Sequence, residues 1–215
     1  LAPILGCTDP SAQNFDPSAN TTFASGGAID NSFASGGFFN GDQHQIFDAF
    51  KPCIIKSAVI YAESSNTITF ELRDSGGGVI DDTTLNVVFG QQTIPLNFEV
   101  PVGTDMQLGV ASGALQNDGL YRNNTGASYP YDIAAAITIT SSSATGNGGS
   151  NALSYYYFYY DIEVETPCEG TSTASWDCDG QGSCFDPGTG QGTYATLSAC
   201  QNKCIARSLY CSAQG

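Results

Sequence analysis

Apolar and polar residues alternate along most of the chain between residues 54 and 165, as in strands that turn one face toward a core. In TITFELR, at 67–73, the side chains of Ile68, Phe70 and Leu72 would point inward. No stretch in this region has the period of an amphipathic helix. Further strands are expected at 54–63, 79–89, 93–100, 106–110, 119–122 and 132–140, the last with Ile133, Ala135, Ile137 and Ile139 inward.

The last expected strand, SYYYFYYDIEVE at 154–165, contains six consecutive aromatic residues. A continuous strand would send Tyr156, Phe158, Tyr160, Ile162 and Val164 into the core. The opposite face would then carry a row of exposed rings followed by acids: Tyr155, Tyr157, Tyr159, Asp161, Glu163 and Glu165.

Short alternating strands separated by Gly, Asn, Asp and Ser turns predict an all-β fold, a jelly-roll-like β-sandwich over residues 51–166. Residues 1–50, where DPSA and FASGG each occur twice, predict a loop-rich module. Residues 167–215 hold six of the eight cysteines and predict a small disulfide-rich module. Its one candidate helix lies in 193–207, with Thr196 or Ser198 as the N-cap.

The even number of cysteines favours disulfides and therefore an oxidising, extracellular compartment. A zinc site is the alternative, which the single histidine and the absence of paired CxxC motifs weaken. The connectivity stays open, since four cysteines alone allow three pairings. One compatible set joins Cys7 to Cys53, forms two bonds among Cys178, Cys184, Cys200 and Cys204, and leaves Cys168 with Cys211.

The net charge of −15 makes nucleic acid and anionic membrane surfaces poor partners. No apolar run approaches the roughly 18 residues of a membrane span, so no membrane insertion is expected. The chain starts at Leu1 rather than Met, which suggests processing or excision from a longer protein. Oxygen-bearing side chains in the first module are candidate calcium ligands, with capping and turn formation as the alternative. They are Asp9, Asn14, Asp16, Asn20 and Asp30.

Three stretches resemble modules of very large secreted surface proteins of Bacteroidetes-type bacteria that use type IX secretion, including adhesins and gliding-motility filaments. GCTDPSAQNFDPSAN resembles their GCTDP module. CDGQGSCFDPGTGQGTYATLSACQNKC resembles a Cys-rich repeat of the same proteins, although its first cysteine spacing, Cys178 to Cys184, is slightly longer. The segment from PVGTDMQLG to the tyrosine run resembles one of their β-sandwich modules.

The resemblance implies a cell-surface or secreted location. It also implies O-glycosylation at Thr83, since Asp82-Thr83-Thr84 resembles the acceptor site of such bacteria. Asn20 and Asn123 begin N-x-S/T sequons, which in a bacterium would often be silent.

Catalysis is not expected. The only histidine, His44, has no nucleophile elbow nearby and is interpreted as a surface or loop residue. Asp161 and Glu163 would lie ~7 Å apart on one strand face, a separation that suits an inverting glycosidase, but neither a cleft nor a raised pKa is indicated.

The function expected first is a structural or adhesive module of a long secreted surface protein, forming part of a filament or stalk through contacts with neighbouring modules or identical chains. The alternative is a carbohydrate-binding accessory module, with or without Ca²⁺. In either case the partner-binding residues would be Tyr155, Tyr157, Tyr159 and Asp161, extended by Tyr121, Tyr129 and Tyr131 in the loop LYRNNTGASYPYDI. Packing of this aromatic face within the chain is the remaining interpretation.

Overall fold

A computed structural model of the chain describes residues 21–113, 119–167, 175–186 and 192–204. The chain divides into two units, of which Thr22–Pro167 is one; residues from Cys168 onward belong to the other.

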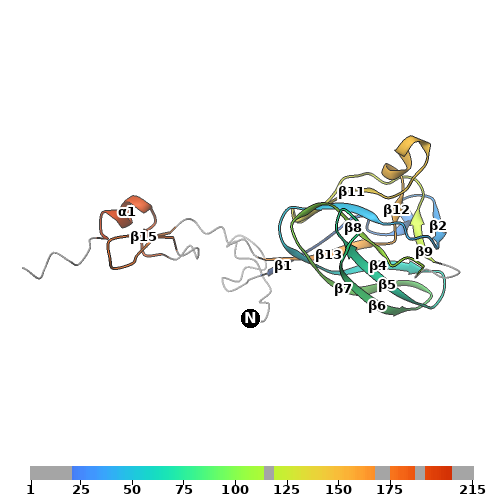
Figure 1. Ribbon diagram of the computed structural model, residues 1–215, viewed down its shortest axis with the longest axis horizontal. Coiled ribbons are helices and arrows are strands. Elements are labelled where there is room, and N and C mark those ends of the chain that lie inside the picture. The colour runs from blue at the N-terminus through green and yellow to red at the C-terminus, as the bar shows by residue number, and fades with distance from the viewer. Residues whose placement is uncertain (1–20, 114–118, 168–174, 187–191, 205–215) are drawn as a thin grey trace, which may run out of the picture. The chain divides into compact units, whose positions relative to one another are not determined.

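The larger unit is an all-β sandwich, which confirms the predicted fold class (Figure 1). One sheet has seven strands in the order β1-β13-β4-β9-β12, with β2 added beside β9 and β7 beside β4. It contains β1 (Thr21–Gly26), β2 (Gly36–Phe39), β4 (Cys53–Ala62), β7 (Gly90–Val100), β9 (Leu120–Asn123), β12 (Tyr156–Tyr157) and β13 (Tyr160–Pro167).

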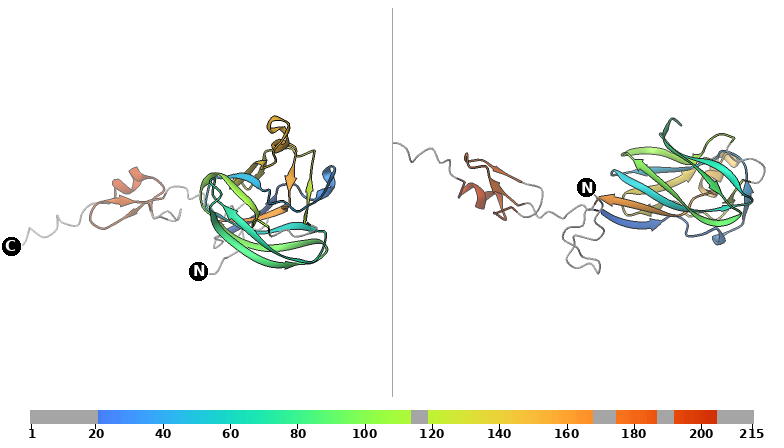
Figure 2. Two further views of the ribbon diagram at one scale, coloured as in Figure 1. Left: turned by 45° about the vertical axis from the view of Figure 1, so that its right-hand side comes forward. Right: turned by 90° about the horizontal axis from the view of Figure 1, so that it is seen from below.

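The second sheet has six strands in the order β10-β11-β3-β8-β5-β6 and packs against the first (Figure 2). It contains β3 (Gln45–Ala49), β5 (Asn66–Arg73), β6 (Val79–Val87), β8 (Gly103–Val110), β10 (Tyr131–Ile133) and β11 (Ile137–Ser142). Two 3₁₀ helices, η1 (Asn31–Phe33) and η2 (Asn147–Leu153), complete the unit.

The core lies between the two sheets and follows the alternation of the sequence. In β5, Ile68, Phe70 and Leu72 are each no more than 1% exposed. The inward residues predicted for 93–100 and 106–110 are buried as well. Because neighbouring strands turn the same face inward, this burial removes a large apolar area from water, which is the main favourable contribution to folding.

One expected strand is a hairpin instead. The stretch 132–140 breaks at Ala134 and Ala135, whose φ angles are +55° and +49°, and the Ala136 N–H donates to the Ile133 carbonyl over 2.9 Å. Ala135, expected inward, is exposed at this turn. The alternation continues through the turn without a Gly or Asn to mark it, so the sequence pattern alone does not reveal the reversal.

The expected boundary at residue 50 is also wrong. Strands β1, β2 and β3 lie before it, and β3 pairs with both β8 and β11 in the middle of the second sheet. Phe47 and Ala49 of β3 are buried at 2% exposure. The sandwich therefore begins near Thr22, and the residues taken as a separate module supply strands to both sheets.

Both chain connections of the sandwich leave from one end. Thr22, near the start of β1, and Thr166, near the end of β13, are joined by a hydrogen bond of 2.9 Å between their hydroxyls. At the opposite end the Asp161 N–H, near the start of β13, donates to the Ala28 carbonyl beyond β1. We call that opposite end, where residues 27–35 and the strands β2, β9 and β12 lie, the distal end (Figure 1).

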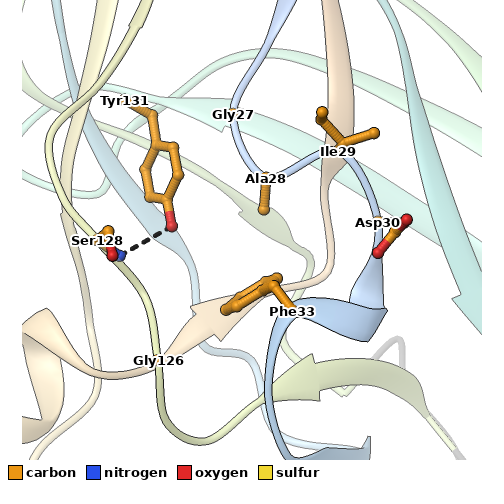
Figure 3. A pocket seen from close by; sticks show the side chains of 8 residues that line it. All are labelled: Gly27, Ala28, Ile29, Asp30, Phe33, Gly126, Ser128 and Tyr131. Carbon is orange, nitrogen blue, oxygen red and sulfur yellow. Dashed lines mark hydrogen bonds between the residues drawn. The ribbon is translucent and has the colours of Figure 1, made fainter.

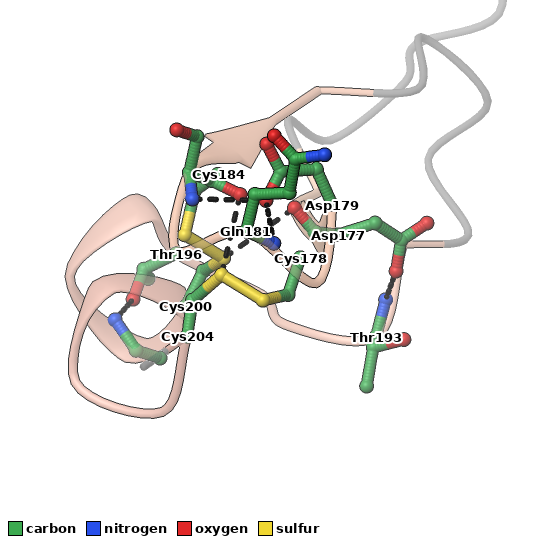
Figure 4. The surroundings of a disulfide bond; sticks show 11 residues. Asp177, Cys178, Asp179, Gln181, Cys184, Thr193, Thr196, Cys200 and Cys204 are labelled. Atoms are coloured by element: carbon green, nitrogen blue, oxygen red, sulfur yellow. Dashed lines mark hydrogen bonds between the residues drawn. A yellow bond between two sulfur atoms is a disulfide. The ribbon is translucent and has the colours of Figure 1, made fainter. Parts of the chain in front are cut away.

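The smaller unit is described over residues 175–186 and 192–204. It pairs β14 (Asp177–Cys178) with β15 (Cys184–Phe185), and α1 (Leu197–Gln201) follows. Disulfides join Cys178 to Cys204 and Cys184 to Cys200 (Figure 4). The expectation of two bonds among these four cysteines is confirmed, and so is the Thr196 N-cap, whose hydroxyl accepts from the Ala199 N–H over 3.1 Å.

The remaining expected disulfides are not formed or fall outside the described residues. Cys53 is a buried free thiol in β4, so it does not form the expected bond to Cys7. Cys7, Cys168 and Cys211 lie outside the described ranges. Within those ranges no helix is both long and apolar enough to span a membrane.

Candidate functional site

The tyrosine run does not form one continuous strand. β12 ends at Tyr157, Phe158 has a φ of +64°, and β13 starts at Tyr160. Because of this break, side chains that a continuous strand would send to opposite faces all point into the interior. Residues 156–160 are each between 0% and 3% exposed. The predicted row of exposed rings is therefore wrong for Tyr157 and Tyr159, while Tyr155 keeps a partly exposed ring.

The buried tyrosines hold loops and strands in place through their hydroxyls. Tyr160 donates to Asn123 Oδ1 over 2.8 Å, Tyr156 accepts from the Ala28 N–H over 3.0 Å, and Tyr159 donates to the Gly109 carbonyl. Burial raises the pKa of each of these three phenols, so they stay neutral and can act as donors at any physiological pH.

A different set of aromatic side chains is exposed. Phe38 in β2, Tyr121 in β9 and Tyr61 in β4 form a connected group that we call the aromatic trio. The Phe38 and Tyr121 ring centroids are 5.5 Å apart, and those of Tyr61 and Tyr121 are 6.3 Å apart. Phe38 is 42% exposed, and the other two rings are partly exposed.

The trio arises from strand register. Phe38 lies directly opposite Tyr121 in the β2–β9 pairing, which places the two rings on one face of the sheet. Tyr121 was among the residues expected at the binding surface. Phe38 and Tyr61 were not, because neither belongs to the tyrosine run and the pairing of β2 with β9 joins residues about 80 positions apart in the sequence.

A hollow of about 440 Å³ lies at the distal end, within the ~300–1,000 Å³ range of small-molecule sites. Phe33 and Tyr131 face it from different segments, with Ala28 between them (Figure 3). The Tyr131 hydroxyl accepts from the Ser128 N–H over 2.9 Å. The lining residues are Gly27, Ala28, Ile29, Asp30, Phe33, Gly126, Ser128 and Tyr131.

Asp30 connects the hollow to the trio. Its carboxylate caps η1, accepting from the Ser32 N–H over 2.8 Å and the Ser32 hydroxyl over 2.6 Å. These bonds lower the pKa of Asp30. Burial is the first cause of the raised pKa of Tyr61, and the charge of Asp30 adds to it. Asp30 thus lines the hollow and acts electrostatically on one ring of the trio.

Among the expected calcium ligands, Asp30 is the one that lies within the described residues, and its carboxylate caps η1. The other four expected ligands, Asp9, Asn14, Asp16 and Asn20, lie outside the described residues. The cap at Asp30 agrees with the capping alternative, and calcium binding stays a prediction.

The remaining expected site residues have mainly structural positions. The Tyr129 hydroxyl donates to the Tyr155 carbonyl over 2.7 Å and lies 2.8 Å from Gln45 Oε1, and burial raises its pKa. Asp161 is half-buried with a φ of +41°. Glu163 accepts from the Ser57 hydroxyl over 3.3 Å, and Glu165 is paired with Lys56 at 3.4 Å.

Two expected glycosylation sites can be compared with the structure. Asn123 is fully buried, and its Nδ2 donates to the Asn31 and Ala34 carbonyls, so it is not an acceptor in the folded protein. Thr83 lies on β6 opposite Phe70 and is partly exposed. Asn20 lies outside the described residues.

His44, interpreted as a surface or loop residue, lies in the loop directly before β3 and is partly buried. Burial, followed by the charge of Arg73, lowers its pKa, and its backbone N–H donates to the Ser143 hydroxyl over 2.8 Å. Within the described residues the imidazole Nδ1 is buried and has no hydrogen-bond partner.

No family model, curated protein or solved structure matches the chain.

Proposed function

We propose that the sandwich is an adhesive module of a secreted cell-surface protein, attached at one end and binding through the distal end. One observation carries the proposal: β1 starts and β13 ends side by side, while the aromatic trio and the hollow lie at the opposite end. A module whose two connections leave together projects from the chain, and its far loops are free to make contacts. A module that extended a stalk in line would have its connections at opposite ends.

The surface chemistry supports contact with a protein or a sugar. Aromatic residues are enriched at protein interfaces, and Phe38 and Phe33 are each about two-fifths exposed. The two disulfides of the smaller unit suit an oxidising location outside the cell. The partner proposed first is a neighbouring module or an identical chain. The proposal assigns the chain no catalytic step.

Carbohydrate binding is the second candidate, and the trio favours it. Tyrosine and phenylalanine rings pack against the C–H faces of sugars, and the tyrosine hydroxyls and Asp30 supply hydrogen-bonding groups at the same surface. The rings that support this candidate are those of the trio, not those of the tyrosine run.

Three variants separate these functions. Phe38→Ala and Tyr121→Ala remove rings of the trio, while Phe89→Ala removes a phenylalanine that is 73% exposed at the β6–β7 turn and that belongs neither to the trio nor to the lining of the hollow. Glycan-array binding that Phe38→Ala and Tyr121→Ala abolish and Phe89→Ala preserves would support the lectin. Arrays run with EDTA show whether Ca²⁺ takes part.

The adhesive module predicts a different result with the same variants. Self-association measured by analytical ultracentrifugation, and ordered assemblies in negative-stain images, should be weakened by Phe38→Ala and kept in Phe89→Ala. A protein that stays monomeric at high concentration and binds no glycan would contradict both functions.

A further inference from the structure

Arg122 in β9 differs from Lys56 and Arg73, the two cations of the sandwich that form the ion pairs described here. Lys56 is paired with Glu165 at 3.4 Å, and Arg73 with Glu71 at 2.6 Å. Within the described residues the side chain of Arg122 has neither an ion pair nor a hydrogen bond, and its Nε and Nη1 are buried without a partner. An unneutralised guanidinium in a chain of net charge −15 therefore requires an explanation.

Aromatic rings hold the guanidinium in place. Its central carbon lies 4.9 Å from the centroid of Phe39, 4.8 Å from that of Tyr155 and 6.0 Å from that of Tyr157. Phe39 belongs to β2 and Tyr157 to β12, the two strands that pair with β9 at this point. Rings support a cation through their faces, but they leave the in-plane N–H groups without acceptors.

The position beside Arg122 is open. Gly37 lies directly opposite Arg122 in the β2–β9 pairing, so a side chain there would share the face of the guanidinium. A Cβ built on Gly37 would meet no atom within 4 Å. The sheet thus carries a notch formed by Gly37, next to a cation that is fixed by rings and lacks an anionic partner.

We propose that Arg122 is a receptor for the carboxylate of an acidic ligand, which enters over Gly37. Arginine suits this role because its charge is permanent, and bonds between charged partners are about twice as strong as neutral ones. Since Nε and Nη1 are buried, the carboxylate meets the guanidinium first at its Nη2 edge. The rings orient the guanidinium before binding, so little side-chain freedom is lost when the carboxylate arrives. Tyr121 and Arg122 are consecutive in β9 and point to opposite faces, so this site does not depend on the aromatic trio.

The test uses the full chain and NMR of the arginine Nε–Hε groups. D-glucuronate is titrated as the acidic probe, D-glucose as its neutral counterpart, and acetate as a carboxylate without a sugar. We expect glucuronate and acetate to shift the Arg122 signal in a saturable manner while glucose leaves it unchanged. The Arg73 signal is the internal control, because its Nε already donates to Glu71 over 2.6 Å. Tighter binding of glucuronate than of acetate would identify the acidic sugar as the ligand.

Two variants test the proposal independently, one at the guanidinium and one at the notch. Arg122→Lys keeps the charge and loses the planar donors, so binding should weaken by about tenfold or more. Gly37→Val fills the notch without altering Arg122, and it should block the shift while the urea midpoint stays within the range of a surface substitution. Equal shifts with glucose and glucuronate, no shift with either acid, or full binding in Gly37→Val would each overturn the proposal. Loss of self-association or of neutral-glycan binding in Phe38→Ala, by contrast, bears only on the function proposed above.

Discussion

The phenolic hydroxyl of Tyr160 donates a hydrogen bond of 2.8 Å to Oδ1 of Asn123, and both residues are fully buried. Asn123 Nδ2 donates in turn to the Asn31 carbonyl over 3.0 Å and the Ala34 carbonyl over 2.8 Å. One amide thus links the tyrosine run to η1 and to the segment that leads into β2. The stability of the distal end therefore depends on a residue whose sequence context indicates only a glycosylation sequon.

Replacing Asn123 with Ala should destabilise the sandwich substantially. The substitution leaves the Tyr160 hydroxyl and two backbone carbonyls without their partner, and each buried polar group left unsatisfied costs about 1–3 kcal/mol. Urea unfolding should show a loss of about 2 kcal/mol or more, whereas Asn124→Ala, at the exposed neighbour, should change the free energy of unfolding by less than about 0.5 kcal/mol. Equal stability of the two variants would show that the amide network has no such role.

Gly36 and Gly37 provide a matched pair on one short strand. A Cβ at Gly36 would lie 2.2 Å from the Arg122 carbonyl oxygen and 2.7 Å from the Tyr121 ring, while one at Gly37 meets nothing. Gly36→Ala should therefore cost about 1–3 kcal/mol or more through overpacking and should disturb the trio. Gly37→Ala should be neutral or slightly stabilising, since alanine restricts the unfolded chain more than glycine does. The difference between the two urea midpoints is the measurement, and similar midpoints would contradict the observed β2–β9 register.

The sequence was sufficient for the sandwich because burial follows alternation wherever a strand is continuous. In β5 and β7 every predicted inward residue is buried. The pattern failed at Phe158 and at Ala134–Ala135, where left-handed backbone reverses or shifts the phase without a Gly or Asn to signal it. A change of phase by one residue moves a whole set of side chains to the other face, which is why a row of tyrosines expected outside is found inside.

The local sequence pattern could not reveal the candidate site either, because its residues come together only through strand pairing. The trio joins residues of β2, β4 and β9, and the Arg122 cluster joins β2, β9 and β12. Each depends on which strands pair, and pairing between distant segments is not encoded in either segment alone. Tyr121 was identified because it lies in an aromatic loop, whereas Phe38 and Gly37 lie in a Gly-rich stretch that indicates only turns.

His44 should make the sandwich less stable as the pH falls. Its pKa in the folded protein is below 6.5 because burial, and then the charge of Arg73, disfavour the imidazolium. The unfolded chain takes up the proton first, so the contribution is fully present above pH 6.5 and is lost progressively as the pH drops through that value toward the folded pKa.

Urea unfolding of the wild type and of His44→Gln, measured between about pH 8 and pH 5.5, tests this linkage. The free energy of unfolding should fall more steeply for the wild type than for the variant over that range. Parallel curves would mean that His44 titrates equally in the folded and unfolded states.

Cys53 should be unreactive in the folded protein and reactive once it is unfolded. It is 5% exposed, and burial raises the pKa of its thiol to about 11, only partly offset by Lys51. At pH 8 roughly one thiol in a thousand would then be ionised, and the thiolate is the species that iodoacetamide attacks. Mass spectrometry should find Cys53 unlabelled in native buffer and labelled in urea without reductant, while Cys178, Cys184, Cys200 and Cys204 should label only after reduction. If Cys53 also required reductant, it would be disulfide-bonded, and the pairing with Cys7 that the sequence suggested would be the first to examine.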